Sequence, residues 1–94
     1  MHIRVVRFTD VTQERVDAMK ERIEGREGPP EGVSAIGIQF LHDADQGTMV
    51  VVQKFETLED MQSSEAALSG MDSGDTPGTR ESVDRCEVVV ERNL

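Results

Sequence analysis

The sequence has neither tryptophan nor tyrosine, and its aromatic residues are three phenylalanines among 94 residues. Large aromatic side chains contribute most of the buried area in many protein interiors, so a chain with so few of them has a thin core. A domain of this length buries only about 60 to 65% of the surface that its unfolded chain exposes. We therefore expect one domain, residues 1–94, that gains stability from a second subunit.

Cysteine occurs once, at Cys86, which excludes a disulfide within the chain and gives no reason to expect an oxidising compartment. The longest apolar runs, such as Met49 to Val52, are far shorter than the roughly 20 residues of a membrane-spanning helix. The first four residues do not have the form of a signal peptide. We therefore expect a cytoplasmic protein.

Basic residues are also few: 10 stand against 19 acidic residues, which gives a net charge of -9 and a pI near 4.5. Such a surface repels the phosphates of nucleic acids and anionic lipid surfaces. We therefore expect neither nucleic acid nor a membrane as a partner.

The chain does contain a regular succession of strand-like and helix-like segments. Asp10, followed by Gln13, forms a helix-capping pattern, and Thr57 begins a second helix with Glu59 and Asp60 in its first turn. Strands are predicted over residues 2–8, 33–41, 48–55 and 82–92, and helices over residues 12–24 and 57–68. The loop from Ser69 to Thr79 either closes over a cavity or only connects two elements.

The inner strands are apolar on both faces. In the third strand Met49, Val51 and Phe55 point one way, and Val50 and Val52 point the other. Two helices cover only one face of a four-stranded sheet, so the second apolar face requires another sheet. The simplest arrangement is a two-fold homodimer with the open faces stacked.

This layout resembles the dimeric α+β barrel superfamily, which includes antibiotic-biosynthesis monooxygenase-like proteins. The segment from Val51 to Met61 carries the local likeness: an aromatic residue at Phe55, a capping Thr57 and acidic residues in the first helical turn. The resemblance implies an α+β fold with a ferredoxin-like β-α-β-β-α-β subunit. That subunit has a four-stranded antiparallel sheet with two helices on one face, and it dimerises into an α+β barrel.

Two departures from that family argue against oxygenase chemistry. The monooxygenase-like members often have tryptophan where this chain has Phe55. They also have a histidine along the second helix, where Gln62 to Glu65 stand here. The superfamily hosts several reactions as well as proteins with no known reaction, so the layout alone assigns no activity.

Few residues have the chemistry of a site. Histidine is the side chain that changes charge near neutral pH, and His42 is a better catalytic or haem-ligand candidate than the near-terminal His2. Gln39 and Gln53 are amides within apolar strands and, with Phe55, are candidates to line a cavity. Cross-interface hydrogen bonds explain the two amides equally well.

The remaining polar residues have ordinary structural explanations. Asp43, Asp45 and Gly47 resemble the start of a calcium loop, but Lys54 occupies the position of the required glutamate. We expect turn-forming roles for Asp72 and Asp75, a buried Cys86, and no metal or cofactor. Arg4, Arg7 and Arg85 are expected at solvated edges of the outer strands or in ion pairs.

The sequence therefore predicts a homodimeric protein that binds a small apolar ligand or acts through interaction, with no evident catalytic constellation. The alternative is a cofactor-independent monooxygenase-like enzyme acting on an aromatic or polyketide-like substrate, and a haem-degrading activity through His42 is a third hypothesis.

Overall fold

The structure, a computed structural model, describes residues 1–25, 32–69 and 78–94. Its elements follow the predicted β-α-β-β-α-β order. They are β1 (His2–Thr9), α1 (Gln13–Glu24), β2 (Gly37–Asp43), β3 (Thr48–Phe55), α2 (Leu58–Ser69) and β4 (Thr79–Glu87). Among these described residues, no helix is long and apolar enough to cross a membrane.

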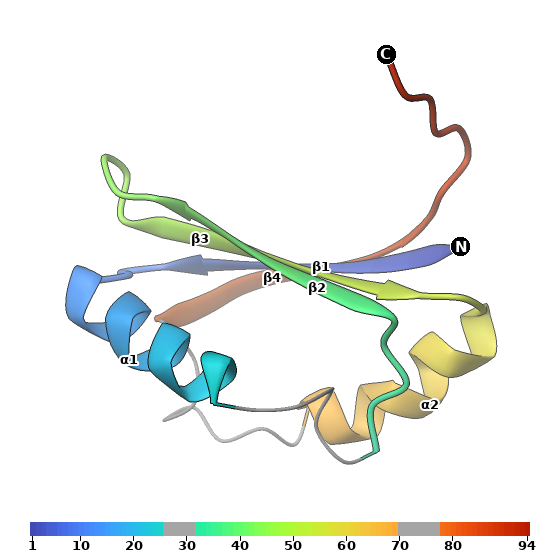
Figure 1. Cartoon of the computed structure of the whole chain (residues 1–94), viewed down its shortest axis with the longest axis horizontal. Helices are drawn as coiled ribbons and strands as arrows, with labels where there is room; N and C mark the ends of the chain where they lie inside the picture. Colours follow the sequence, from blue (N-terminus) through green and yellow to red (C-terminus); the bar gives the residue numbers. More distant parts are fainter. Residues whose placement is uncertain (26–31, 70–77) are drawn as a thin grey trace.

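The four strands form an antiparallel sheet in the order β2-β3-β1-β4, so β1 and β3 are interior strands. β2 and β3 form the predicted hairpin, with Leu41 opposite Val50. Both helices lie on the same side of the sheet, α1 under one end and α2 under the other (Figure 1). The fold is thus the expected ferredoxin-like one.

In the described residues, the core between the sheet and the helices comprises two clusters. Helix α1 contributes Met19 to the first cluster, and helix α2 contributes Met61 and Leu68 to the second. The strand residues of the first cluster are Val6, Phe8, Met49 and Val51, whereas Phe55 belongs to the second. Each helix therefore buries its apolar side against a different part of the sheet.

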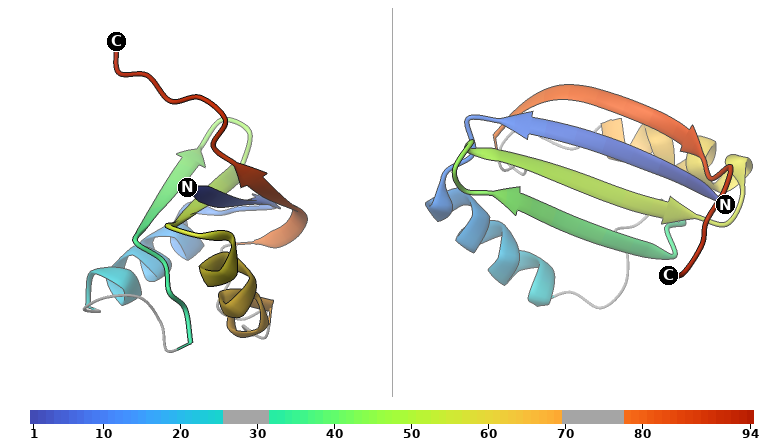
Figure 2. Two further views of the ribbon diagram at one scale, coloured as in Figure 1. Left: turned by 90° about the vertical axis from the view of Figure 1, so that its right-hand side faces the viewer. Right: turned by 90° about the horizontal axis from the view of Figure 1, so that it is seen from above.

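No helix of the described residues covers the opposite face of the sheet (Figure 2). Val5 lies opposite Val52, and Leu41 lies opposite Val50, so apolar side chains line this face from β1 to β2. The prediction that the inner strands are apolar on both faces is confirmed, and one of those faces lacks a cover in the part of the chain that the structure describes.

Helix α1 is capped by Thr12, not by Asp10 as the sequence pattern predicts. The Thr12 hydroxyl accepts a hydrogen bond of 3.3 Å from the Arg15 amide. The reason lies in Val11, which is buried and whose amide bonds the Gly47 carbonyl at 2.9 Å. Because burial and this hydrogen bond fix Val11, Thr12 is the first residue whose side chain is available to cap helix α1. Asp10 instead adopts the left-handed conformation, with a φ of 56°, where the chain turns from β1 toward α1.

Strand β2 begins later than predicted, at Gly37: the Ile36 amide still bonds the Lys54 carbonyl of β3, at 2.8 Å, but Val33 and Ser34 contact α2. Val33 is buried in the α2 cluster, and the Ser34 amide donates a hydrogen bond of 2.8 Å to the Ser64 hydroxyl. The residues at positions 33 and 34, just before β2, are therefore attached to α2.

Strand β4 ends at Glu87, whereas the sequence predicts a strand to residue 92. Its partner β1 begins at His2, which lies opposite Glu87. One further hydrogen bond, of 3.0 Å, runs from the Val88 amide to the Met1 carbonyl. Residues 89–94 pair with no strand among the residues that the structure describes.

Candidate functional site

A row of four residues crosses the helix-bearing face of the sheet between the two core clusters. Gln53 of β3 lies opposite Ile38 of β2 on one side and opposite Arg4 of β1 on the other. Arg4 in turn lies opposite Arg85 of β4. Since residues directly opposite in a sheet project to the same face, all four side chains face the helices. We call these residues, together with Glu65 of α2, the arginine row.

Arg4 is the centre of the arginine row, and only 4% of its side chain is exposed. Its Nη1 donates a hydrogen bond of 2.9 Å to Gln53 Oε1, and its Nε donates one of 3.1 Å to Glu65 Oε2. These bonds use two of the five N–H donors of a guanidinium. They hold its plane between β3 and α2.

Glu65 receives hydrogen bonds from two arginines. Arg85 Nε donates a bond of 3.0 Å to Glu65 Oε1, and Arg85 Nη2 contacts the same oxygen. Burial is the largest influence on the pKa of Glu65 and raises it, but the hydrogen bonds and charges of Arg85 and Arg4 together lower the pKa below its ordinary value. Glu65 is therefore a carboxylate that bridges two cations.

The arginine row carries more positive than negative charge, in a chain whose net charge is -9. Burial lowers the pKa of Arg4, Glu65 raises it, and the positive charges of Arg85 and Arg80 lower it again. Arginine nevertheless stays protonated in proteins. Two guanidinium groups with a single bridging carboxylate leave a local excess of positive charge.

Arg4 has more N–H donors than its two hydrogen bonds use. In residues 1–25, 32–69 and 78–94, no buried side-chain nitrogen or oxygen lacks a hydrogen-bond partner. Among those residues, the two bonds of Arg4 come from Nε and Nη1, so the N–H groups of Nη2 are not used by them. An anionic group that approaches it meets a positioned, charged donor.

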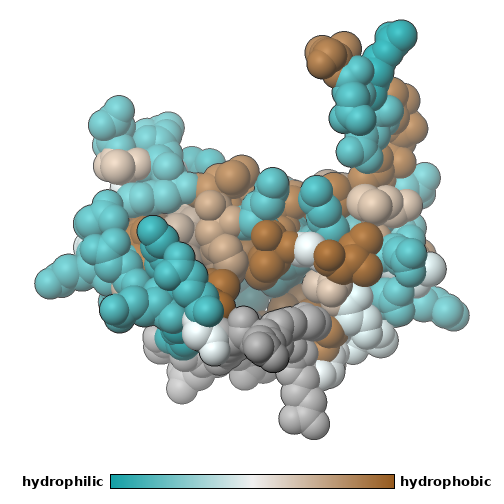
Figure 3. All heavy atoms as spheres, viewed as in Figure 1, coloured by the Kyte–Doolittle hydropathy of each residue, from teal (hydrophilic) through white to brown (hydrophobic). Residues whose placement is uncertain are grey.

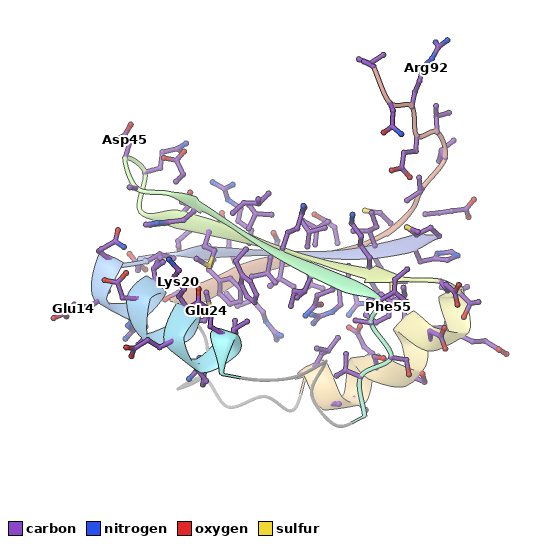
Figure 4. All side chains as sticks on the ribbon, viewed as in Figure 1. Glu14, Lys20, Glu24, Asp45, Phe55 and Arg92 are labelled. Carbon is purple, nitrogen blue, oxygen red and sulfur yellow. The ribbon has the colours of Figure 1, made fainter. Side chains whose placement is uncertain are left out.

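The sequence candidates fall into two groups on the sheet. Gln53 and Phe55 are buried together on the helix-bearing face, and Phe55 points toward α2 (Figure 4). Gln39 lies opposite Val52 on the open face and is exposed. The fold therefore places Gln53 and Phe55 near the arginine row, and Gln39 on the other side of the sheet.

The two histidines lie at opposite ends of the helix-bearing face. His42 lies opposite Met49 near the hairpin, and His2 lies opposite Phe55. At about 3.3 Å per residue, the four positions between Ile38 and His42 place His42 roughly 13 Å along β2 from the arginine row. His2 is only two positions from Arg4, so it is the histidine nearer to that row.

The acidic residues of the hairpin have a structural role. Asp43 accepts hydrogen bonds from the Gln46 amide and side chain, at 3.2 and 2.7 Å, and these bonds lower its pKa. The described part of the chain contains no group of three or more His, Cys, Asp or Glu residues that is able to hold a metal ion. Asp72 and Asp75 lie outside the described residues.

Two expectations about single residues are wrong. Cys86 is exposed, not buried, because it lies opposite Ile3 on the face of the sheet that has no cover. Arg4 and Arg7 are not on an outer strand, because β1 lies between β3 and β4. The expected ion pairs do form: Arg4 and Arg85 pair with Glu65, and Arg7 pairs with Glu81 at 2.9 Å.

Sequence reasoning did not find the arginine row, although one signal for it was present. Arg4 has the same strand parity as Val6 and Phe8, which are buried, whereas Arg7 has the opposite parity. A charged residue on the buried face of a central strand needs a partner, so this parity singles out Arg4. Nothing in the sequence pairs Arg4 with Glu65, which is 61 positions away.

No protein-family model matches this chain, and a search of curated proteins finds no match. A search of solved structures finds a mutant of MhuD with two manganese protoporphyrin IX molecules bound per active site. The two chains share 16% sequence identity with a TM-score of 0.66, and the match covers 100% of each. A likeness at this identity establishes the fold, which agrees with the predicted ferredoxin-like subunit.

Proposed function

We propose that this chain is a homodimeric small-molecule-binding protein of the dimeric α+β barrel type, formed by residues 1–94. The ligand has an apolar body and an anionic group, and it binds at the arginine row. The observation that carries this proposal is the Arg4 guanidinium, which is almost fully buried between two apolar clusters and has more N–H donors than its bonds to Gln53 and Glu65 use.

The charge of the arginine row favours an anion over a neutral ligand. Burying an arginine is costly, and Glu65 compensates only part of the charge of Arg4 and Arg85. A ligand carboxylate completes that compensation and accepts charge-assisted hydrogen bonds from guanidinium groups. Arg85 bonds Glu65 with Nε and Nη2, and its side chain is 52% exposed, so its remaining donor capacity lies toward the surface, where such a ligand approaches.

Apolar surface beside the row suits the body of the ligand. Ile38, the β2 member of the row, is 47% exposed, and Phe40 on the same face is only partly buried. Figure 3 shows hydrophobic atoms at the surface over the β2 side of the molecule. Small-molecule sites typically combine such apolar walls with a few placed polar groups.

Manganese protoporphyrin IX is a suitable first probe, because a MhuD mutant of similar fold binds it. It combines a broad apolar ring with carboxylates, which is the chemistry that we propose for the ligand. A second probe, 8-anilinonaphthalene-1-sulfonate, has an apolar body and one anionic group without a metal.

The test is a fluorescence titration with 8-anilinonaphthalene-1-sulfonate and an absorbance titration with manganese protoporphyrin IX. Replacing Arg85 with glutamine removes one charge-assisted hydrogen-bond donor, so we expect the affinity for both probes to fall about three- to tenfold. Arg15→Gln is the matched control, because Arg15 is exposed on α1, outside both the arginine row and the open face. Equal affinities for the two variants contradict the proposed site.

The homodimer forms, in this proposal, by stacking of the two open sheet faces. That face is lined by apolar residues that no described helix covers: Ile3, Val5, Val50, Val52 and Leu41. Stacked sheets pack about 10 Å apart, and apolar residues on both inner faces form their core. The stacked faces therefore bury additional apolar side chains, which compensates for the thin core of a chain with few aromatic residues.

Native mass spectrometry of freshly purified protein tests the subunit number and any retained ligand in one measurement. We expect a dimer, and we expect Val52→Asp to convert it to a monomer because the charge is then buried between the sheets. Ala44→Asp, in the exposed hairpin turn, is the matched control. A monomeric wild-type protein excludes the stacked arrangement.

A cofactor-independent monooxygenase-like activity on an aromatic or polyketide-like substrate is the alternative proposal. Its support is the likeness in fold to MhuD. Dioxygen uptake with a panel of quinols tests it, with His42→Ala and His2→Ala as paired variants. Absence of uptake across the panel leaves binding without turnover.

A further inference from the structure

A β-bulge at Glu81 decides which charged side chains of the edge strand β4 face the helices. Ser82 of β4 lies opposite Arg7 of β1. Arg80 lies opposite Phe8, the next residue of β1, so Glu81 lies opposite no residue of β1 and is the extra residue of the bulge. Since Phe8 projects into the core beneath the helices, Arg80 shares the helix-bearing face. In a regular ladder Glu81 would occupy that position.

The Glu81 carboxylate is held on the other side of the sheet. Arg7 has the strand parity opposite to the buried Phe8, so its side chain lies on the open face. Arg7 Nε donates a hydrogen bond of 2.9 Å to Glu81 Oε2. The bulge therefore keeps a negative charge away from the helix-bearing face and places a positive charge there instead.

The register of β4 is fixed on both sides of the bulge. Before the bulge, Thr79 lies opposite Thr9, and a Cβ at Gly78 would collide with the Thr9 carbonyl oxygen. After the bulge, Arg85 lies opposite Arg4 and bonds Glu65 of α2. The placement of Arg80 thus follows from contacts at both ends of the strand.

Arg80 adds its charge to that of the arginine row. Burial is the largest influence that lowers the pKa of Arg4, and the charges of Arg85 and Arg80 lower it further, so both lie within electrostatic reach of Arg4. In residues 1–25, 32–69 and 78–94, no carboxylate pairs with Arg80, which is exposed. Among these residues the three guanidinium groups therefore have one bonded carboxylate, Glu65, and two positive charges remain without a bonded counter-charge.

We propose that Arg80 is a third ligand-binding arginine, and that the ligand carries two negative charges on one head group, as the phosphate monoester of an apolar molecule does. This inference rests on the proposed function, because the ligand is the one that binds at the arginine row. A dianion matches the two positive charges, whereas a single carboxylate compensates only one of them. A phosphate monoester carries about -1.5 to -2 charges at pH 7 and three acceptor oxygens, which guanidinium groups bind in bidentate fashion.

The test compares 1-naphthyl phosphate with 1-naphthyl sulfate by isothermal titration calorimetry at about pH 8. The two probes share the apolar body and the ester bond, but at this pH the phosphate carries one more negative charge, since its second pKa is about 6. We expect wild type to bind the phosphate about tenfold more tightly than the sulfate.

Replacing Arg80 with glutamine removes the third guanidinium group. We expect Arg80→Gln to lower the affinity for the phosphate about three- to tenfold and to bring the two affinities within about threefold of each other. Arg80→Lys retains the charge, so we expect it to retain a preference of at least about threefold. Arg15→Gln, on the exposed side of α1, is the matched control and leaves the wild-type preference unchanged.

Glu81→Ala tests the bulge itself. If Glu81 is held on the open face, its removal leaves the affinities for both probes unchanged. Higher affinities in Glu81→Ala would place this carboxylate beside the ligand and overturn the role of the bulge. Circular dichroism checks that each variant retains the fold.

The outcomes separate this inference from the proposed function. Equal affinities of wild type for the two probes, or a preference that Arg80→Gln leaves intact, overturn the dianionic ligand and the role of Arg80 but leave an anion site at the arginine row. Failure of wild type to bind either of the naphthyl probes, 8-anilinonaphthalene-1-sulfonate or manganese protoporphyrin IX overturns both proposals.

Discussion

Arg4 and Glu65, 61 positions apart in the sequence, are joined by a hydrogen bond of 3.1 Å from Nε to Oε2. This bond connects β1 to α2 in the space between the two apolar clusters of the core. The arginine row therefore has two effects. It attaches α2 to the sheet, and it presents positive charge beneath the sheet.

Replacing Glu65 with glutamine is expected to lower the free energy of unfolding by about 1–3 kcal/mol, because the variant leaves a buried guanidinium without its counter-charge. Urea denaturation followed by circular dichroism measures this change. Glu59→Gln, an exposed carboxylate in the first turn of the same helix, is the control and is expected to cost about 0.5 kcal/mol. Equal losses for the two variants are incompatible with a stabilising role of the arginine row.

The contribution of Glu65 to stability is expected to depend on pH. Its pKa is lower in the folded protein than its ordinary value, so at acidic pH the unfolded chain binds more protons than the folded one. The stabilisation is therefore fully present above the ordinary glutamate value and is lost as the pH falls through the folded value.

Accordingly, the difference in unfolding free energy between wild type and Glu65→Gln is expected to shrink from about pH 7 to about pH 3. The pKa of Asp43 is also lowered, by its hydrogen bonds with Gln46, which adds a separate sensitivity to acid. Because both proteins contain Asp43, subtracting the two curves removes its effect. A difference that stays constant over this range argues against a charged Glu65 in the folded protein.

The sequence predicts best the elements whose limits are set locally. Strand β3 has the predicted bounds, and Thr57 caps α2 as expected, its hydroxyl accepting a bond of 3.1 Å from the Asp60 amide. Signals within a few residues decide both features. The end of β4, by contrast, depends on where β1 begins, and these residues are more than 80 positions apart.

The same contrast between local and long-range signals applies to the residues of the site. Gln53 was a candidate because an amide within an apolar strand is a local anomaly. Glu65 was not, because a carboxylate on a polar helix is unremarkable until the helix is placed over the sheet. Its role depends on the packing of α2 against β1 and β3, which single-chain periodicity does not specify.

Gly78, just before β4, is expected to tolerate no side chain. A Cβ at this position lies 2.3 Å from the Thr9 carbonyl oxygen and 3.1 Å from Val11 Cγ2, so Gly78→Ala forces the backbone apart. We expect a loss of about 1–3 kcal/mol in unfolding free energy. Gly25→Ala is the control, because a Cβ there meets nothing closer than 3.5 Å and the expected effect is neutral or stabilising. Similar melting temperatures for both variants contradict the close approach at Gly78.

Ser64 and Ser63 provide a test of how α2 is attached to the segment before β2. The Ser64 side chain is fully buried, and its hydroxyl donates a bond of 2.7 Å to the Asp60 carbonyl while accepting one of 2.8 Å from the Ser34 amide. Ser63 makes only the bond to the Asp60 carbonyl, at 3.1 Å, and is exposed.

Ser64→Ala leaves the Ser34 amide without its acceptor, so we expect a loss of about 1–3 kcal/mol in unfolding free energy. Ser63→Ala is expected to be neutral or slightly stabilising, because alanine has the higher helix propensity. Hydrogen exchange at the Ser34 amide separates attachment from general stability: the amide is expected to exchange faster in Ser64→Ala but not in Ser63→Ala. If Ser34 keeps its protection in both variants, the hydroxyl does not hold this segment on α2, and packing of Val33 alone accounts for the late start of β2.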